Sequence, residues 1–149
     1  MRTETHRIEA GDGLEISLRE RSASDPEAAI VFVHGATYAS RAVFDPRGMP
    51  DHAWLTWAAE ADSAAFGVDI RGYGDSDRPP EMDAENANAP ARAPAAANDV
   101  EAAIRFVRER LSCPIHLVGT SWGTIIAGTL LTRSDAPEIA SVTLHAPVF

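Results

Sequence analysis

Cysteines, long apolar segments and positive charges are scarce in this sequence, and each scarcity excludes some classes of protein. Cys113 is the single cysteine, so no internal disulfide can form and a buried, inert thiol is the expected state. The first residues are polar and charged, without the apolar segment of a signal peptide, and no stretch approaches the length of a membrane span. These absences predict a cytoplasmic protein with no membrane partner.

Positive charge is scarce as well. The 149 residues hold 13 Lys and Arg against 22 Asp and Glu, which gives a formal net charge of −9. No cluster of Lys or Arg offsets this charge locally, so it would repel phosphate backbones and argues against a nucleic-acid partner. Hydrophobic residues make up 45% of the chain, enough for the core of one domain.

The first part of the chain predicts a hairpin. Residues 6–10 and 14–19 alternate apolar and polar positions and are joined by Gly11, Asp12 and Gly13. An Asp-Gly pair between such segments is typical of an antiparallel hairpin, here with one solvent-exposed face.

Strands and helices are expected to alternate after the hairpin. Apolar runs predict four buried strands, at residues 28–33, 63–70, 114–118 and 139–144. Further runs predict three helices, at residues 52–61, 98–111 and 124–131. This order predicts an α/β fold, a three-layer sandwich with a mainly parallel sheet.

Some details of these elements can be predicted too. Trp54 and Trp57 share one face of the first helix, so at least one of them is expected in the core. Asn98, followed by Glu101, predicts the start of the second helix as a capping box. Residues 80–97, rich in Ala and Pro, predict a loop within the domain, because the segment is too short to form a second one.

The stretch from residue 117 to 123 carries the strongest chemical signal. It places Gly119-Thr120-Ser121-Trp122-Gly123 between a predicted strand and a predicted helix, the arrangement of a nucleophile elbow. A tight turn of this kind exposes the serine hydroxyl to a base, and side chains at the two glycines would strike the neighbouring strand or helix. Ser121 is therefore the predicted nucleophile; the alternative is a serine that only caps a buried helix.

A second loop can supply donors for an oxyanion. The strand at 28–33 ends in His34-Gly35-Ala36-Thr37, and the amides of Ala36 and Trp122 are the predicted oxyanion donors, with Thr37 as the alternative to Ala36. His34 is expected to hold this loop by side-chain hydrogen bonds and not to act as the base.

Aromatic residues follow this loop. Tyr38 and Phe44 are expected on a loop beside the oxyanion donors, where they and Thr37 can contact a substrate. The alternative is that the aromatic side chains belong to the core.

The strand at 63–70 leads into a turn with several glycines. Asp75 and Asp77 suggest a calcium loop, but Pro79 stands where the third ligand would be and no Glu closes the loop. We therefore expect neither a metal site nor a cofactor. Charge pairs are expected to hold the turn, among Asp69, Arg71 and Arg78.

Together these motifs resemble the first part of an α/β-hydrolase fold serine hydrolase. The similarity covers nearly all 149 residues and rests on the oxyanion loop (HGAT), residues 69–79 (DIRGYGDSDRP), the elbow (GTSWG) and residues 145–149 (HAPVF). The resemblance implies acyl transfer to water from a small ester-like substrate. It does not choose among esters, lactones, thioesters, amides and carbon–carbon bonds.

In this family an acid and then a histidine follow the serine along the chain. The resemblance implies that the acid follows the seventh strand and the histidine the eighth, so residues 1–149 are expected to form a single, C-terminally truncated domain without the last strands. Asp135 and Glu138 are expected on the side away from the site. A pair between Ser121 and His145 is the remaining alternative within the chain.

Three hypotheses of function follow. The chain is a fragment of an active serine hydrolase, and is itself inactive or severely impaired; or another chain completes it; or it is a non-catalytic binding module. The last strand would present an unpaired apolar edge, which predicts self-association.

Overall fold

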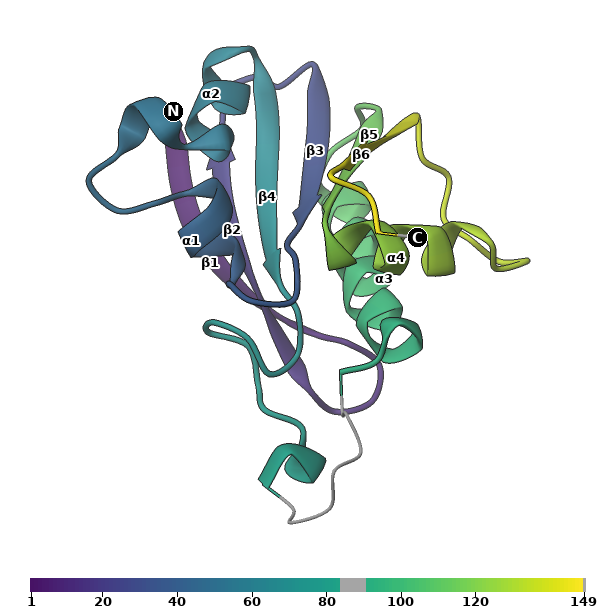
Figure 1. Cartoon of the computed structure of the whole chain (residues 1–149). Helices are drawn as coiled ribbons and strands as arrows, with labels where there is room; N and C mark the ends of the chain where they lie inside the picture. Colours follow the sequence, from purple (N-terminus) through teal and green to yellow (C-terminus); the bar gives the residue numbers. More distant parts are fainter. Residues whose placement is uncertain (84–90, 149) are drawn as a thin grey trace.

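The fold is that predicted from the sequence, a six-stranded and mostly parallel sheet with helices on both faces (Figure 1). The computed structural model describes residues 1–83 and 91–148. The strands are β1 (Arg2–Glu9), β2 (Glu15–Ser22), β3 (Ala28–Val33), β4 (Ser63–Asp69), β5 (Ile115–Thr120) and β6 (Ser141–His145). The α-helices are α1 (Ser40–Phe44), α2 (Trp54–Glu60), α3 (Ala93–Arg110) and α4 (Trp122–Leu131), with short 3₁₀ helices η1 (Pro50–His52) and η2 (Pro80–Asp83).

The strand order is β1-β2-β4-β3-β5-β6, so β3 lies inside the sheet. It is parallel to β4 and β5, and β6 is parallel to β5. The predicted antiparallel hairpin is formed by β1 and β2, and β2 is also antiparallel to β4. The carboxyl ends of β3, β4 and β5 therefore meet at one edge of the sheet, where α/β proteins place their sites.

One prediction for the hairpin is wrong. Ser17 was expected on the solvent-exposed face of the second strand, but it is 2% exposed. On the other face of the same strand, Glu20 and Ser22 are also buried. The reason is tertiary: β2 is paired on both edges, and α2 packs against it. A strand inside a sheet that is covered by helices loses the exposed face that alternation predicts for a simple hairpin.

Two hydrophobic clusters fill the spaces on either side of the sheet. The larger one includes Val31, Phe66 and Leu117 of the sheet with Ile104 of α3 and Ile126 of α4. The smaller one lies on the α1 and α2 face and contains Phe32, Phe44, Leu55, Ala58 and Ala65. Figure 1 shows the two pairs of helices on opposite faces of the sheet.

The aromatic residues before β4 are placed differently from the prediction. Phe44 was expected on a loop, but it lies in α1 and is fully buried against Phe32. At least one of Trp54 and Trp57 was expected in the core, yet they are 37% and 76% exposed, because α2 turns Leu55 and its alanines to the sheet instead.

The helix before β5 begins earlier than predicted. α3 starts at Ala93, so Asn98 lies inside the helix and does not cap it. The predicted loop at residues 80–97 is therefore wrong at its end, and its start forms η2; residues 84–90 lie outside the described residues. The helix buries Val100, Ile104 and Val107 on one face, against the sheet.

The turn after β4 is held by partners other than those predicted. Arg71 pairs with Asp99 of α3 and with Asp12 of the hairpin turn, not with Asp69. Asp69 instead accepts hydrogen bonds from the amide and hydroxyl of Ser40, at 2.8 and 2.6 Å, at the start of α1. Three parts of the chain distant in sequence, the hairpin turn, α1 and α3, are thus fastened to the end of β4 and the turn after it.

Across the described ranges, no helix is long and apolar enough to cross a membrane.

Candidate active site

Ser121 occupies a strained turn between β5 and α4. Its φ angle is +53°, a left-handed value that residues other than glycine rarely adopt. Such strain persists only where the surrounding structure enforces it, and it is common at functional sites. The predicted strand–turn–helix context of Ser121 is thereby confirmed.

The two flanking glycines explain how the turn is enforced. A Cβ atom on Gly119 would lie 2.6 Å from the carbonyl oxygen of Gly123, and one on Gly123 would lie 2.3 Å from the carbonyl oxygen of Val33. The start of α4 therefore packs directly against the ends of β5 and β3. The expectation that side chains there would strike the neighbouring strand or helix is confirmed.

The oxyanion loop lies against this serine. A Cβ atom on Gly35 would be 3.1 Å from Ser121 Cβ and 3.4 Å from Ser121 Oγ, so the backbone between His34 and Ala36 passes beside the hydroxyl. Trp122 is the first residue of α4, and the amides of a helix's first turn have no partner within the helix. Within the described part of the chain, the amide of Ala36 donates no hydrogen bond either.

His34 fixes the loop through both ring nitrogens. Its Nδ1 lies 2.6 Å from the carbonyl oxygen of Gly35, and its Nε2 accepts a hydrogen bond of 3.1 Å from the amide of Ile70. Burial lowers the pKa of His34, against the opposing effects of the Gly35 carbonyl and Asp69. The imidazole is therefore neutral at neutral pH and holds the loop, as predicted.

Tyr73 is a site residue that sequence reasoning missed. Its hydroxyl donates a hydrogen bond of 2.5 Å to the carbonyl oxygen of Ala36, and its ring contacts those of His34 and Trp122, with centroids 4.8 and 6.4 Å away. Two consecutive carbonyls of the loop are thus held, one by His34 and one by Tyr73. The only signal in the sequence was the position of Tyr73 between two glycines after β4.

A cavity of about 400 Å³ opens at this point. Ala36, Tyr73 and Trp122 line it together with residues 91–93 before and at the start of α3. Both predicted oxyanion residues therefore border one space. Thr37 and Tyr38 are exposed on the adjoining loop, whereas Phe44, predicted to contact substrate with them, is in the core.

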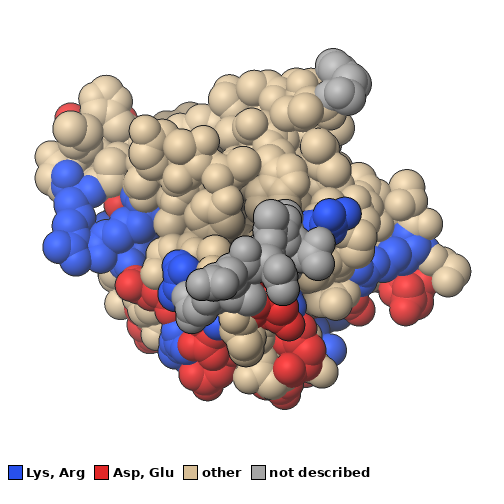
Figure 2. Space-filling model, turned by 60° about the horizontal axis from the view of Figure 1, so that its bottom comes forward, with Lys and Arg blue, Asp and Glu red and all other residues tan. Residues whose placement is uncertain are grey.

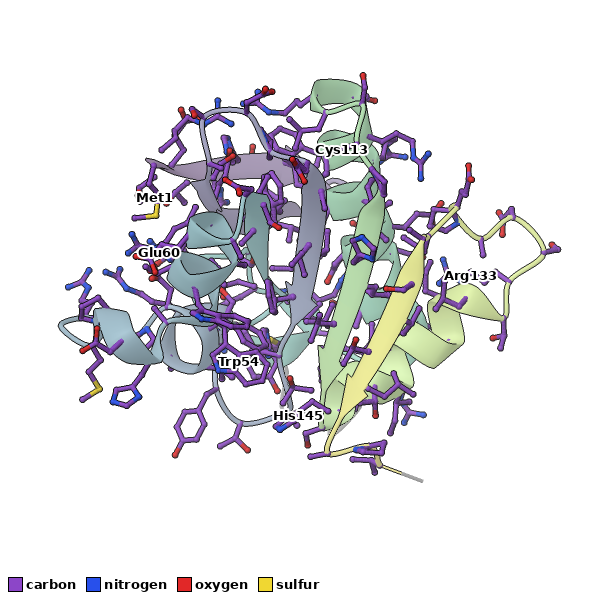
Figure 3. All side chains as sticks on the ribbon, turned by 90° about the horizontal axis from the view of Figure 1, so that it is seen from above. Met1, Trp54, Glu60, Cys113, Arg133 and His145 are labelled. Carbon is purple, nitrogen blue, oxygen red and sulfur yellow. The ribbon has the colours of Figure 1, made fainter. Side chains whose placement is uncertain are left out.

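His145 comes close to the elbow through its backbone only. The amide of Ser121 donates a hydrogen bond of 3.0 Å to its carbonyl oxygen. Its ring packs edge-on against Trp54, with 5.4 Å between centroids, as Figure 3 shows from above the sheet. Among the residues that the structure places, no side chain makes a hydrogen bond to Ser121 Oγ, so the pair with His145 is not formed.

The two acidic residues after α4 lie away from the site, as predicted. Glu138 contacts Arg108 near the end of α3, with 3.8 Å between its Oε2 and the Arg108 Nη1. The next residues begin β6 beside the start of β5, since the amide of Ala140 donates to the carbonyl of Ile115. Asp135 lies in the same connection, at the amino end of β5.

A larger cavity, of about 740 Å³, lies elsewhere on the sheet. It is mainly apolar and is bordered by Phe32, Trp54, Trp57, Val118 and Thr143 on the α2 face. None of the predicted catalytic or oxyanion residues borders it. In the turn after β4, Asp77 accepts hydrogen bonds from Arg7 and from the amide of Glu15.

Figure 2 brings the bottom of Figure 1 toward the viewer, and Lys, Arg, Asp and Glu lie mainly in the lower half and at the two sides of this view. The cavity beside Ala36 and Trp122 is itself bordered by one charged residue, Arg92.

Comparisons with known proteins agree with this geometry. The model of the Alpha/beta hydrolase family matches residues 30–149. Among curated proteins, none matches the sequence.

Solved structures show the same fold. The esterase EaEST from Exiguobacterium antarcticum is 22% identical, with a TM-score of 0.69. The match covers 97% of this chain and 46% of the esterase chain. The alpha/beta hydrolase GrgF from Penicillium sp. sh18 is 20% identical, with a TM-score of 0.75 and coverages of 99% and 46%. The epoxide hydrolase VrEH1 from Vigna radiata is 19% identical, with a TM-score of 0.68 and coverages of 95% and 37%. The chain thus spans less than half the length of these three proteins.

Proposed function

The chain belongs to the alpha/beta hydrolase family, and from that premise we propose that Ser121 is the nucleophile of a serine hydrolase that cleaves carboxylic-ester-type bonds. The observation that carries the proposal is the left-handed backbone of Ser121 at the end of β5, enforced by the packing of Gly119 and Gly123. This conformation costs free energy and projects the hydroxyl beside the oxyanion loop, which a helix cap would not require.

In the proposed reaction, Ser121 Oγ attacks the carbonyl carbon of the substrate. The developing oxyanion accepts hydrogen bonds from the amides of Ala36 and Trp122, and the alcohol leaves as the acyl-enzyme forms. Water then releases the acid and regenerates the hydroxyl. The dipole of α4 supports the same negative charge, because its amino end faces the site.

The general base is proposed to come from other polypeptide. An imidazole takes the serine proton in this mechanism, and the two histidines next to the elbow are engaged elsewhere: His34 in the loop and His145 against Trp54. The histidine would belong either to a longer form of this protein or to another chain. Alone, these 149 residues would be inactive or severely impaired, because the members of a triad act as a unit.

The proposed substrate is a small ester. The cavity beside Ala36 and Trp122 has room for a small acyl or alcohol group, and Arg92 also borders it. Thr37 and Tyr38 are the residues proposed to contact it, since both are exposed beside the oxyanion loop.

A binding module is the second candidate. The observation that favours it is the missing hydrogen-bond partner of Ser121 Oγ within the described ranges, since an unactivated hydroxyl can bind a ligand without turning it over. The two candidates differ in one respect. Ser121→Ala abolishes the reaction of an enzyme, while a binding module still holds its ligand.

Fluorophosphonate labelling tests the proposal. A preorganised oxyanion hole retains part of the catalytic advantage without a base, so Ser121 should be labelled faster than other exposed serines. Ser141 is a matched control, because it is exposed and its hydroxyl lies 2.7 Å from His116 Nδ1 but not at an elbow. Peptide mass mapping would follow both sites over time, with and without added imidazole as a substitute base.

Preferential labelling of Ser121, accelerated by imidazole and lost in Ser121→Ala, is the expected result. Labelling of Ser121 no faster than that of Ser141 in a folded sample would contradict a nucleophilic role and favour the binding module.

A further inference from the structure

A second cluster of chemically active side chains lies on the hairpin, at the opposite edge of the sheet from β6. In the register of β1 and β2, Glu4 is directly opposite Glu20. His6 is two residues after Glu4, so the three side chains project from the same face of the ladder. Among the described residues, these three form a group of metal-ligating side chains whose ligand atoms lie close enough together to hold a metal ion.

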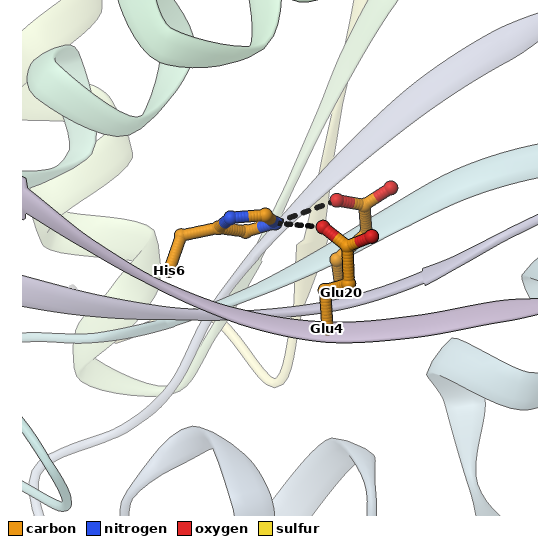
Figure 4. Close-up of side chains that lie close together, drawn as sticks. All are labelled: Glu4, His6 and Glu20. Atoms are coloured by element: carbon orange, nitrogen blue, oxygen red, sulfur yellow. Dashed lines mark hydrogen bonds and ion pairs between the residues drawn. The ribbon is translucent and has the colours of Figure 1, made fainter.

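The distances within the cluster match a coordination shell. His6 Nε2 is 2.7 Å from Glu20 Oε2 and 3.7 Å from Glu4 Oε2, and the three ligand atoms all lie within 4.8 Å of one another (Figure 4). Ligands at 2.0–2.2 Å from a tetrahedral zinc ion are about 3.4 Å apart. Small side-chain movements would therefore complete the shell.

The surroundings hold two of the ligands in place. Glu20 is fully buried, and the side chain of His6 is 13% exposed, with its ring 4.8 Å from that of Phe106 of α3. Glu4 is 42% exposed on the open side. The cluster is thus rigid at its base and accessible at one ligand, which provides an entry path for an ion.

Arg2 is the remaining charged group of the cluster. Its guanidinium binds Oε1 of Glu20 and leaves Oε2 facing His6. Two carboxylates and one guanidinium give a net charge of −1 when the imidazole is neutral, so a cation is favoured beside them. Arg2 then acts as an outer hydrogen-bond donor to a ligand carboxylate, as is common around protein metal ions.

We propose that Glu4, His6 and Glu20 form a binding site for a divalent transition-metal ion, with Zn²⁺ as the best match. One imidazole and two carboxylates suit zinc, which accepts nitrogen and oxygen ligands in a tetrahedral arrangement and leaves the fourth position to water. Mg²⁺ and Ca²⁺ prefer shells of oxygen only. The absence of metal was predicted only from the turn after β4. Glu20 meets Glu4 and His6 through the register of β1 and β2, which the sequence does not show directly.

The site would be structural. β1 and β2 lie three or more strands away from β5 and Ser121 in the sheet, so the ion would not reach the proposed reaction. It would fasten the edge strand β1 to β2, and the inference does not depend on the proposed hydrolase function.

Calorimetric titration of Zn²⁺ into the untagged full-length chain tests the site. Cys113→Ser serves as the background, since a thiol is a competing zinc ligand. One equivalent of Zn²⁺ should bind, and His6→Ala and Glu4→Gln should each weaken the binding at least about 10-fold. Zn²⁺ should also raise the melting temperature of the background protein but not that of His6→Ala.

His116→Ala is the matched control, because His116 is a second histidine on a strand and pairs with Ser141, outside the cluster. Its zinc affinity should equal that of the background. No saturable binding up to about 1 mM Zn²⁺, or binding that survives His6→Ala while His116→Ala abolishes it, would overturn the proposal.

Discussion

The amide of Ser121 donates a hydrogen bond of 3.0 Å to the carbonyl oxygen of His145, while the His145 imidazole packs against Trp54. The last strand therefore supports the backbone of the elbow and does not offer its histidine to the serine.

Gly123→Ala should destabilise the protein by about 1–3 kcal/mol, the range for overpacked positions. The new Cβ would lie 2.3 Å from the carbonyl oxygen of Val33, and backbone atoms of β3 cannot move aside cheaply. Urea denaturation of the purified variant measures the loss. Gly128→Ala in the same helix is the control: nothing lies within 4 Å of its Cβ position, and alanine favours a helix by about 1 kcal/mol. Equal stabilities of the two variants would contradict the packing argument.

Asp99→Ala should lower the free energy of unfolding by up to about 3–5 kcal/mol, because it leaves the buried Arg71 guanidinium with only the half-exposed carboxylate of Asp12. Asp99 is fully buried and accepts a hydrogen bond of 2.7 Å from Arg71 Nη2 and one of 2.9 Å from the Arg71 amide. Burial raises the pKa of Asp99, and Arg71 opposes that rise.

The double variant Arg71→Met with Asp99→Leu should lower the free energy of unfolding by less than Asp99→Ala alone, since it removes both charges together. Denaturant titrations of the two proteins give the comparison. A double variant at least as unstable as the single one would show that the pair is not the cause.

Stability should fall as the pH drops below about 6.5, the usual pKa of an unfolded histidine. Burial lowers the pKa of His34 in the folded protein, so the unfolded chain binds the proton first, and folding loses up to about 1.4 kcal/mol per pH unit between the two pKa values. The stabilisation is complete above that range.

His34→Gln should flatten this dependence between pH 8 and pH 5, whereas His52→Gln, at an exposed histidine, should not. Urea midpoints across the range provide the measurement. Parallel curves for the wild type and His34→Gln would argue against His34 as the titrating group.

We propose that the chain self-associates through β6. The strand is paired on one edge only and exposes the apolar side chains of Val142 and Leu144, which are 39% and 50% exposed. The other edge, β1, is protected by its charged residues. Light scattering should show a molar mass that rises with protein concentration in the wild type and stays monomeric in Val142→Lys. The control Thr3→Lys, on β1, should behave as the wild type; a monomeric wild type at about 100 µM would refute the proposal.

The sequence by itself determined the order of the elements and the identity of the elbow. Apolar periodicity and glycine spacing are local properties, and they predicted β3, β4 and α4 and the steric need for Gly119 and Gly123. The same local signals predicted that His34 holds the loop after β3, which its contacts with Gly35 and Ile70 confirm. Family membership confirmed the resemblance on which the serine hydrolase hypothesis rests.

Only the tertiary structure decided which residues meet across the fold. The helix α1 was not predicted, because it has five residues and no cap of its own, and Asp69 supplies the partner of its first amide from 29 residues away. Phe44 is buried, and Trp54 is exposed, because the sheet fixes the face that each helix presents. Tyr73 contacts Ala36, and Glu4, His6 and Glu20 converge, through loop packing and strand register. Such contacts join residues distant in sequence, and no local pattern encodes them.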